Sequence, residues 1–230
     1  LDQRLSVESP VTYTIKACSR ISEIGRDAWD ACANPASGQY PFDPFVSYAF
    51  LNALEESGSS VAATGSAPYH LALEDDHGQV LGVAPLYLKS HSQGEYVFDY
   101  SWADAFERAG GRYYPKLQCS VPFTPATGRR LLAIEDKYED YLASGVMEVA
   151  EKMDVSSVHI TFAEKSQWDK LGKLGFLQRT DKQFHWHNNQ YQTFDDFLSQ
   201  LSSKKRKTIR KERREASRNG IEIECLSGTE

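Results

Sequence analysis

The sequence predicts an α/β protein with a mixed, mostly antiparallel sheet flanked by helices. Segments typical of strands alternate with segments typical of helices along the 230 residues, which indicates a sheet covered by helices. Predicted strands over 69–74 and 79–89 flank the turn from Asp75 to Gly78, a pattern typical of an antiparallel hairpin. A long strand or a pair of strands is predicted over 176–191. Because a purely parallel sheet needs a crossover between its strands, this order favours a mixed sheet.

The N-terminal third supplies the first strand and two helices. Residues 11–18 alternate apolar and polar side chains and are rich in β-branched residues, which predicts a strand. Apolar residues at helical spacing predict helices over 22–32 and 45–56, joined by a Pro- and Gly-rich loop over 34–44. Small polar residues over 57–66 predict a flexible loop before the hairpin.

Further elements follow the hairpin in an order that again mixes strands and helices. In chain order they are a strand over 95–99, a helix over 101–109, a strand over 116–122, a helix over 136–153, a strand over 157–162, a helix over 166–174, the long strand over 176–191, helices over 194–200 and 202–218, and a strand over 221–225. The helix over 136–153 has the clearest apolar face. Gly175 ends the helix over 166–174.

Charge is distributed very unevenly along the chain. The net charge is −6, yet residues 204–218 hold nine basic and two acidic side chains, so the remainder carries −13. The four cysteines lack the spacing of a zinc site or a disulfide framework, so a reducing cytoplasm is expected. No apolar run approaches the roughly 20 residues of a membrane span, and 1–10 has no signal pattern. A soluble acidic body with one basic helix is therefore expected.

Two stretches resemble the GNAT acyltransferase superfamily. Residues 171–176, LGKLGF, are similar to the helix end and Gly-Phe turn that precede the last core strands of GNAT domains. Residues 121–132, VPFTPATGRRLL, lie where that fold has a strand leading into a phosphate-binding loop and a helix. The resemblance implies a GNAT-like sheet.

The basic segment resembles the link between the two GNAT-like domains of Fem-type transferases. The matching positions are Arg206, Ile209, Arg210, Arg214, Arg218, Asn219 and Gly220. In addition, 97–132 and the stretch QFHWHN at 183–188 are similar to a bacterial FemAB-like branch labelled peptidoglycan biosynthesis or recognition. The resemblance implies a first domain over 1–192, a basic helical linker over 193–220, and the first strand of a second, truncated domain over 221–230.

The activity that this resemblance implies is an acyl- or aminoacyltransferase acting on an amine. The expected acceptor is a small molecule or a peptidoglycan precursor, and the expected donor is acyl-CoA or aminoacyl-tRNA. A different class of function stays open, namely a non-catalytic module that recognises an anionic or peptidoglycan-derived ligand. The basic helix could bind RNA, dock on an anionic membrane or lipid-linked precursor, or simply be a solvated helix whose arginines pair with the acidic body. The sequence predicts no oligomeric state.

A cofactor-binding loop is predicted at 124–130. Gly128 permits close backbone approach, Thr127 offers a hydroxyl, and Arg129 and Arg130 could hold phosphate oxygens. Pro125 removes one backbone donor, and the loop departs from the usual CoA-binding pattern. The alternative is a Pro/Gly turn with solvated arginines.

Candidate catalytic and substrate-binding side chains gather at 99–116. Asp99 and Asp104 are candidate catalytic carboxylates, while Trp102 lies beside them as a substrate-binding aromatic residue. The further substrate-binding candidates that follow are Tyr113, Tyr114 and Lys116. Carboxylates among aromatic residues could bind an amine and titrate at shifted pH. The alternative is an ordinary helix start, with Ser101 as the N-cap and Asp104 in the first turn.

Two histidines complete the set of candidates. His185 and His187 would lie on one face of the predicted strand over 176–191, since alternate residues point the same way. His185 is a candidate catalytic base, and Trp186 between them is a candidate substrate contact. Two histidines without a third ligand nearby in sequence predict no metal site.

Overall fold

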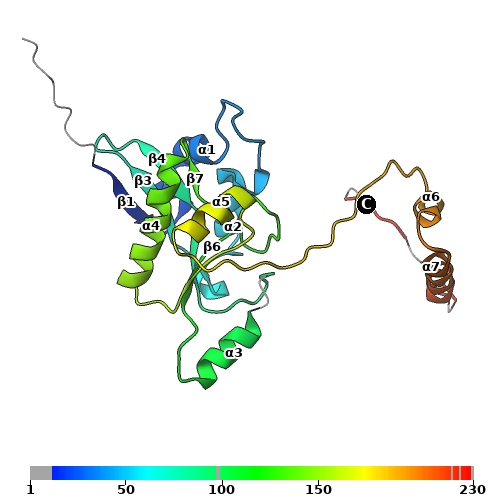
Figure 1. Ribbon diagram of the computed structural model, residues 1–230. Helices are drawn as coiled ribbons and strands as arrows, with labels where there is room; N and C mark the ends of the chain where they lie inside the picture. Colours follow the sequence, from blue (N-terminus) through cyan, green and yellow to red (C-terminus); the bar gives the residue numbers. More distant parts are fainter. Residues whose placement is uncertain (1–11, 97–98, 219, 223, 229–230) are drawn as a thin grey trace, which may run out of the picture. The chain divides into compact units, whose positions relative to one another are not determined.

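The computed structural model describes residues 12–96, 99–218, 220–222 and 224–228. The chain divides into two compact units, Leu1–Gln178 and Arg179–Glu230, which are described separately. The first unit contains all the strands that the structure describes (Figure 1). These strands are β1 Thr14–Cys18, β2 Ser66–Pro68, β3 His70–Glu74, β4 Val80–Ala84, β5 Leu86–Lys89, β6 Lys116–Cys119, β7 Leu132–Ala133 and β8 Val158–Ile160.

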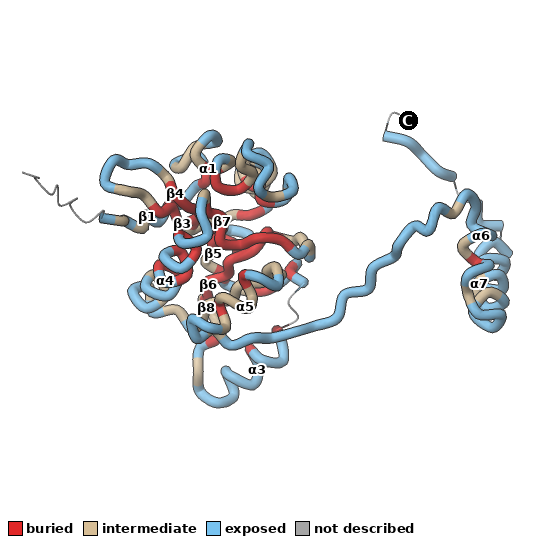
Figure 2. Tube along the Cα trace, turned by 45° about the horizontal axis from the view of Figure 1, so that its top comes forward, coloured by how far each residue is buried: buried red, intermediate tan, exposed pale blue. Residues whose placement is uncertain are grey.

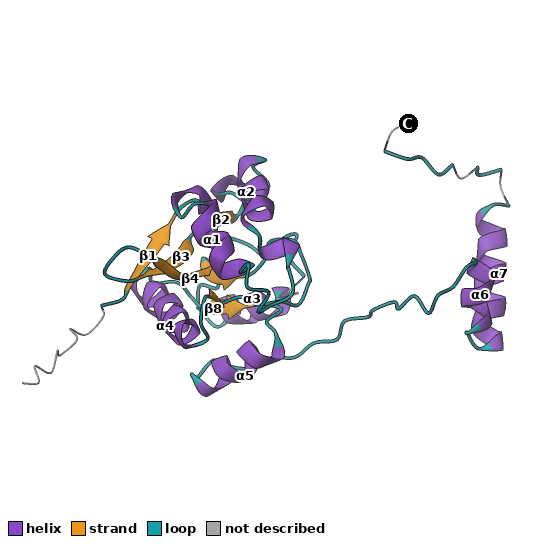
Figure 3. Ribbon diagram, turned by 90° about the horizontal axis from the view of Figure 1, so that it is seen from above, coloured by secondary structure: helices purple, strands orange, loops and turns teal. Residues whose placement is uncertain are grey.

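Helices of the first unit connect and cover these strands. They are α1 Arg26–Ala33, α2 Tyr48–Glu56, α3 Tyr100–Arg108, α4 Lys137–Lys152 and α5 Lys165–Lys173, with 3-10 turns at Ile21–Glu23, Pro44–Val46 and Ala62–Thr64. Figure 3 shows α1 and α2 on one side of β3 and β4, and α4 on the other. Strands and helices therefore alternate along the first unit, as predicted.

The strands form two four-stranded sheets, in the orders β1-β3-β4-β7 and β2-β5-β6-β8. Every named pair is antiparallel except β6 and β8, which are parallel. The predicted fold class, a mixed and mostly antiparallel α/β architecture flanked by helices, is therefore confirmed.

The first sheet is apolar on both faces because helices cover each of them. On one face, Leu71 and Leu73 pack with Leu142 and Val146 of α4. On the other face, the alternate residues of the same strands pack against α1 and α2, in a cluster that includes Trp29 and Leu51. The buried Trp29 ring also donates Nε1–H to the Val46 carbonyl oxygen at 2.8 Å. Figure 2 shows the buried residues concentrated in these strands.

A proline divides the single strand predicted over 79–89. Pro85 separates β4 from β5 and has no N–H to donate to a ladder. As a result β4 pairs with β3 and β7, whereas β5 pairs with β2 and β6 in the other sheet. A similar interruption affects the predicted helix over 22–32, where Gly25 at φ 85° separates a 3-10 turn from α1.

Several predicted strands are wrong. Residues 176–191 are all described, none lies in a strand, and most of the segment is exposed. Of the strand predicted over 95–99, residues 95, 96 and 99 form no strand, and 97–98 lie outside the described residues. Of the strand predicted over 221–225, the described residues 221, 222, 224 and 225 form none either. In each case the sequence offers β-forming residues, but no neighbouring strand supplies the ladder that would hold them.

Among its described residues, the second unit contains a non-helical segment over 179–192, a short helix and the basic helix. These are α6 Phe194–Ser199 and α7 Ser203–Ala216. Thr193 caps α6, and the two helices are joined by an Arg210–Asp195 ion pair at 2.7 Å. The Arg213 guanidinium lies over the Phe194 ring at 4.4 Å. No residue of α7 is buried within its unit, so its cationic side chains lie on the surface.

Candidate functional site

One face of the second sheet carries polar side chains in the interior. In β5 and β6, Tyr87 lies opposite Gln118 and Lys89 lies opposite Lys116. Alternate residues of a strand share a face, so these four side chains lie on the same face of the sheet. All four are at most 1% exposed. Two lysines without solvent contact require anionic partners nearby.

Asp99 provides the partner for Lys116. It occupies the N-cap position of α3, but its carboxylate makes no cap hydrogen bond and is directed to the sheet instead. Its Oδ2 accepts hydrogen bonds from Lys116 Nζ, from Tyr113 Oη at 2.9 Å and from Ser92 Oγ at 3.2 Å. Tyr114 Oη donates in turn to Ser92 Oγ at 2.9 Å. The other carboxylate oxygen, Oδ1, is buried and has no hydrogen-bond partner among the described residues.

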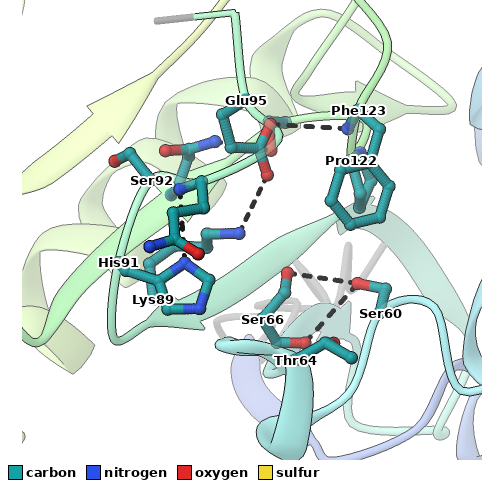
Figure 4. Close-up of polar contacts among 12 residues, drawn as sticks. Ser60, Thr64, Ser66, Lys89, His91, Ser92, Glu95, Pro122 and Phe123 are labelled. Carbon is teal, nitrogen blue, oxygen red and sulfur yellow. Dashed lines mark hydrogen bonds and ion pairs between the residues drawn. The ribbon is translucent and has the colours of Figure 1, made fainter. Parts of the chain in front are cut away.

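A second ion pair lies beside the first. Lys89 Nζ is 2.9 Å from Glu95 Oε1, and both side chains are buried. The other oxygen of Glu95 accepts the Phe123 backbone N–H at 3.4 Å. Figure 4 shows the Glu95 carboxylate between the Lys89 amine and the backbone of Phe123. Together the two pairs form a neutral group of four buried charges, which we call the lysine–carboxylate cluster: Lys89, Glu95, Asp99 and Lys116.

Burial and ion pairing shift the pKa values of Lys116 and Asp99. Burial lowers the pKa of Lys116 below its ordinary value, and the attraction of Asp99 offsets that effect only in part. For Asp99, burial raises the pKa, but the hydrogen bond and charge of Lys116, with the hydroxyls of Ser92 and Tyr113, outweigh it and lower the pKa overall. Burial also raises the pKa of Tyr114. Asp99 is therefore a carboxylate at neutral pH, and its buried Oδ1 accepts no hydrogen bond from the described residues.

The predicted residues Asp99, Tyr113, Tyr114 and Lys116 are thus brought together, whereas two of their sequence neighbours are not. Asp104 lies on the exposed side of α3 and pairs with Arg108 one turn later. The Trp102 side chain is 62% exposed. The expectation that Ser101 caps the helix is wrong, because α3 begins at Tyr100. A catalytic role for Asp104 and substrate contact by Trp102 stay predictions.

The loop with Gly128, Arg129 and Arg130 has an internal structural task. It does not open a helix, since α4 begins only at Lys137. Arg129 donates to the carbonyl oxygens of Cys32, Ala33 and Ala133, at 3.5, 3.4 and 3.1 Å. Arg130 donates to those of Thr161, Arg129 and Ala126, at 2.9, 3.0 and 2.5 Å. Both side chains are buried, so neither is a solvated arginine of a surface turn. Cofactor binding by this loop, including Thr127, stays a prediction.

His185 and Trp186 belong to the second unit. His185 Nε2 is 3.1 Å from Gln183 Oε1, and its ring lies 6.4 Å from that of His187. Trp186 is 65% exposed and lies 6.1 Å from the Tyr191 ring. The shared strand face expected for the histidines is wrong, because this segment forms no strand. Their functional roles stay predictions.

Sequence reasoning missed half of the lysine–carboxylate cluster. Lys89 and Glu95 were not candidates, and neither were Ser92, Tyr87 and Gln118. The available signal was the pattern of β5, LYLK, and β6, KLQC, in which polar residues alternate with leucine or cysteine. That pattern ordinarily indicates a strand with one solvated face. Only the tertiary structure shows that Ser92, Glu95, Asp99 and Tyr113, which lie between β5 and β6 in the chain, pack over this face.

The structure also limits two other kinds of site. Within the described ranges, no group of three or more His, Cys, Asp or Glu side chains is placed to hold a metal ion. Likewise, none of the described helices has both the length and the apolar character needed to cross a membrane. A hollow of about 700 Å³ lies along β1, β3 and β4, and its lining residues include Lys16, Glu74 and Val80. No member of the lysine–carboxylate cluster lines it.

The first unit is thus an α/β domain whose second sheet carries a buried polar cluster on one face. Comparison of the sequence with known families gives a match over residues 20–230 to the FemAB-like family, described as peptidoglycan biosynthesis/recognition. The chain belongs to the FemAB-like family. No curated protein sequence matches it.

Acetyltransferases are among the solved structures that align with this chain. An acetyltransferase of Trypanosoma brucei aligns with 76% of this chain and 99% of its own, with 11% identity and a TM-score of 0.41. Aminoglycoside 6′-N-acetyltransferase AAC(6′)-Ih of Acinetobacter baumannii aligns with 77% of this chain and 99% of its own, with 14% identity and a TM-score of 0.41.

Proposed function

We propose that this protein is an acyltransferase that passes an acyl group to an amine of a peptidoglycan-related acceptor. The observation that carries the proposal is the unpartnered Oδ1 of Asp99, a buried anionic acceptor within a cluster of lysines and tyrosines. A buried acceptor without a donor is costly, and an amine N–H would satisfy it. Membership of a family described as peptidoglycan biosynthesis/recognition supports the choice of acceptor.

Asp99 and Lys116 would have different tasks in the proposed reaction. The amine nitrogen forms a bond to the acyl carbon, the bond from that carbon to the donor's sulfur or ester oxygen breaks, and one proton passes from the amine to the leaving group. Asp99, ionised at neutral pH, would accept a hydrogen bond from the amine and stabilise the positive charge that develops on nitrogen. Lys116, held by Asp99, would place positive charge beside the oxygen of the tetrahedral intermediate. The donor would be an acyl-CoA or an aminoacyl-tRNA.

A transfer assay with the full chain tests the proposal. Acetyl-CoA, longer acyl-CoAs and aminoacyl-tRNA serve as donors, muropeptides with a free amine serve as acceptors, and mass spectrometry detects the product. We expect Asp99→Asn to lower kcat/KM by about 100-fold or more, the usual cost of losing a positioned polar catalytic group. Asp104→Asn is the matched control, because it changes an aspartate on the same helix that is exposed and paired with Arg108. An equal loss in the control would contradict a specific catalytic role of Asp99.

Loss of folding would imitate loss of catalysis, so a second variant is needed. The double variant Asp99→Asn, Lys116→Met removes both charges and should regain stability, yet it should remain inactive. A double variant with wild-type turnover would exclude the pair from the chemistry. If the wild type gives no product and calorimetry detects no binding of any donor, the transferase proposal is wrong. Binding of muropeptides without turnover would then support the non-catalytic recognition module.

A further inference from the structure

The basic helix α7 carries a row of exposed cations along one side. Over Ser203–Ala216 it holds eight basic and two acidic side chains, a net charge of +6. Because an α-helix has about 3.6 residues per turn, residues three and four apart in sequence lie on the same side. The members of the row follow this spacing, are all exposed and extend over about 15 Å of the helix. We call this row the lysine face: Lys204, Lys207, Lys211 and Arg214.

Three other arginines of α7 contact α6. Arg206 is half-buried and donates to the Ser199 carbonyl oxygen at 3.3 Å. Arg210 and Arg213 make the contacts with α6 described above. Among the described residues, the ion pairs of the basic segment are those of Arg210 and Arg218. The lysine face therefore has no acidic side chain within 4 Å in that part of the chain.

The stability of α7 itself does not explain the lysine face. Like charges three and four residues apart repel each other and destabilise a helix. The first turn contains no acidic residue, although the positive end of the helix dipole favours acids there. The two acids of the helix, Glu212 and Glu215, lie outside the sector of about 80° that the lysine face covers. An external negative charge would offset the repulsion, so the arrangement indicates an anionic partner.

The composition of the lysine face fits an anionic membrane surface better than a nucleic acid. Three of its four cations are lysines, whose compact, hydrated ammonium group acts as a point charge, whereas the planar fork of arginine is suited to nucleic-acid recognition. Single-stranded nucleic acids also stack their bases on aromatic side chains. Residues 203–216, all of which the structure describes, include no aromatic residue. A straight row of lysines on one side of a helix can contact a flat, negatively charged surface along its whole length.

We infer that α7 docks on an anionic membrane surface through the lysine face. The helix axis then lies parallel to the surface, and α6 lies on a side of α7 that does not contact it. Each Lys or Arg near such a surface strengthens binding about fivefold, so four of them give roughly several hundred-fold. The inference is independent of the proposed acyl transfer, because docking on a membrane needs neither an acyl donor nor an amine acceptor.

Sedimentation of the full chain with sucrose-loaded vesicles tests the inference. We expect binding to vesicles of phosphatidylcholine and phosphatidylglycerol in equal parts, and at least about 100-fold weaker binding to vesicles of phosphatidylcholine alone. Lys207→Gln should weaken binding about fivefold, and the triple variant Lys204→Gln, Lys207→Gln, Lys211→Gln about 100-fold. Lys205→Gln is the matched control, because it removes the same charge from another side of the same helix turn. It should weaken binding less than about twofold, since salt screens charges that are not at the surface.

Four outcomes would refute membrane docking. These are equal sedimentation with both kinds of vesicle, equal losses in Lys207→Gln and Lys205→Gln, a loss in Lys207→Arg, which keeps the charge, and undiminished binding at about 1 M salt, where the Debye length is only about 3 Å. An RNA hairpin that binds when the anionic vesicles do not, and that the triple variant releases, would refute it in favour of a nucleic-acid site.

The vesicle assay also separates this inference from the proposed function. It contains no acyl donor, so vesicle binding by a protein without transfer activity would support docking and leave only the transferase proposal refuted. Glutamine has nearly the helix propensity of lysine, so the variants should keep α7 helical. Circular dichroism of each variant confirms that the helix content is retained.

Discussion

Removing Lys116 should destabilise the protein strongly, because it leaves Asp99 as an uncompensated buried charge. Both side chains have no solvent exposure, and Asp99 Oδ2 is the acceptor of the Lys116 ammonium. Deleting one partner of a buried pair costs about 3–5 kcal/mol. For a chain of this size, 1 kcal/mol corresponds to about 2–4 °C in Tm. Lys116→Met should therefore lower Tm by roughly 6–20 °C.

The double variant Asp99→Asn, Lys116→Met is compared with the single variant Lys116→Met. It removes both charges together, so most of the loss should be recovered, since buried pairs replaced as a unit are often neutral. Circular dichroism during thermal and urea unfolding measures the Tm and the free energy of unfolding of all variants. Lys165→Met is the control, because Lys165 pairs with Asp169 on an exposed helix face and should change stability by only about 0.3–0.5 kcal/mol. If Lys116→Met lowers the free energy of unfolding by less than about 1 kcal/mol, the argument from burial is refuted. It is also refuted if the double variant is no more stable than Lys116→Met.

Three further predictions concern other titratable and polar groups. Because the folded pKa of Asp99 is below its ordinary 3.8, the ionised carboxylate stabilises the fold above pH 3.8, and this stabilisation is lost as the pH falls from 3.8 through the folded pKa. In urea titrations, the stability difference between wild type and Asp99→Asn should therefore be smaller at pH 3 than at pH 6. A difference that grows would contradict this sign. Arg130→Met strips donors from three carbonyl oxygens and should cost at least about 2 kcal/mol; a loss under about 0.5 kcal/mol in the same assay would show that water replaces the guanidinium. Burial raises the pKa of Cys32 and Cys119 to about 12, whereas Cys225 is exposed. Alkylation at pH 8 followed by mass spectrometry should therefore label Cys225 before Cys32 and Cys119, and equal labelling of the three would disprove this order.

The fold was predictable where local pattern and packing agree. The helix over 136–153 became α4 within one residue at each end, because its apolar face covers the first sheet. Strand predictions failed where pairing decides the outcome. Residues 176–191 contain β-forming side chains but no partner strand, and β7, with only two residues, forms through pairing with β4. Such ladders depend on distant segments, which a local pattern does not specify.

The candidate site shows the same division. Asp99, Tyr113, Tyr114 and Lys116 were predictable as a group because they are close in sequence and rich in chemistry. Their exact arrangement was not, because Asp99 and Asp104 are equivalent in sequence but opposite in burial. Helix geometry separates them, since α3 presents Asp104 to solvent while Asp99 precedes the helix. Lys89 and Glu95 required knowledge of which segment covers the sheet.

The alternation in β5 has a consequence for how this protein can change. Leu86 lies in the apolar core, while Tyr87 and Lys89 supply the polar face of the same strand. Inserting one residue after Pro85 would exchange the two sets, so it would place a lysine in the core and a leucine in the site. Length variation among relatives should therefore avoid this strand and occur in connections such as 36–39, whose residues are all exposed. A library of single-residue insertions, scored for soluble expression, would map this boundary directly.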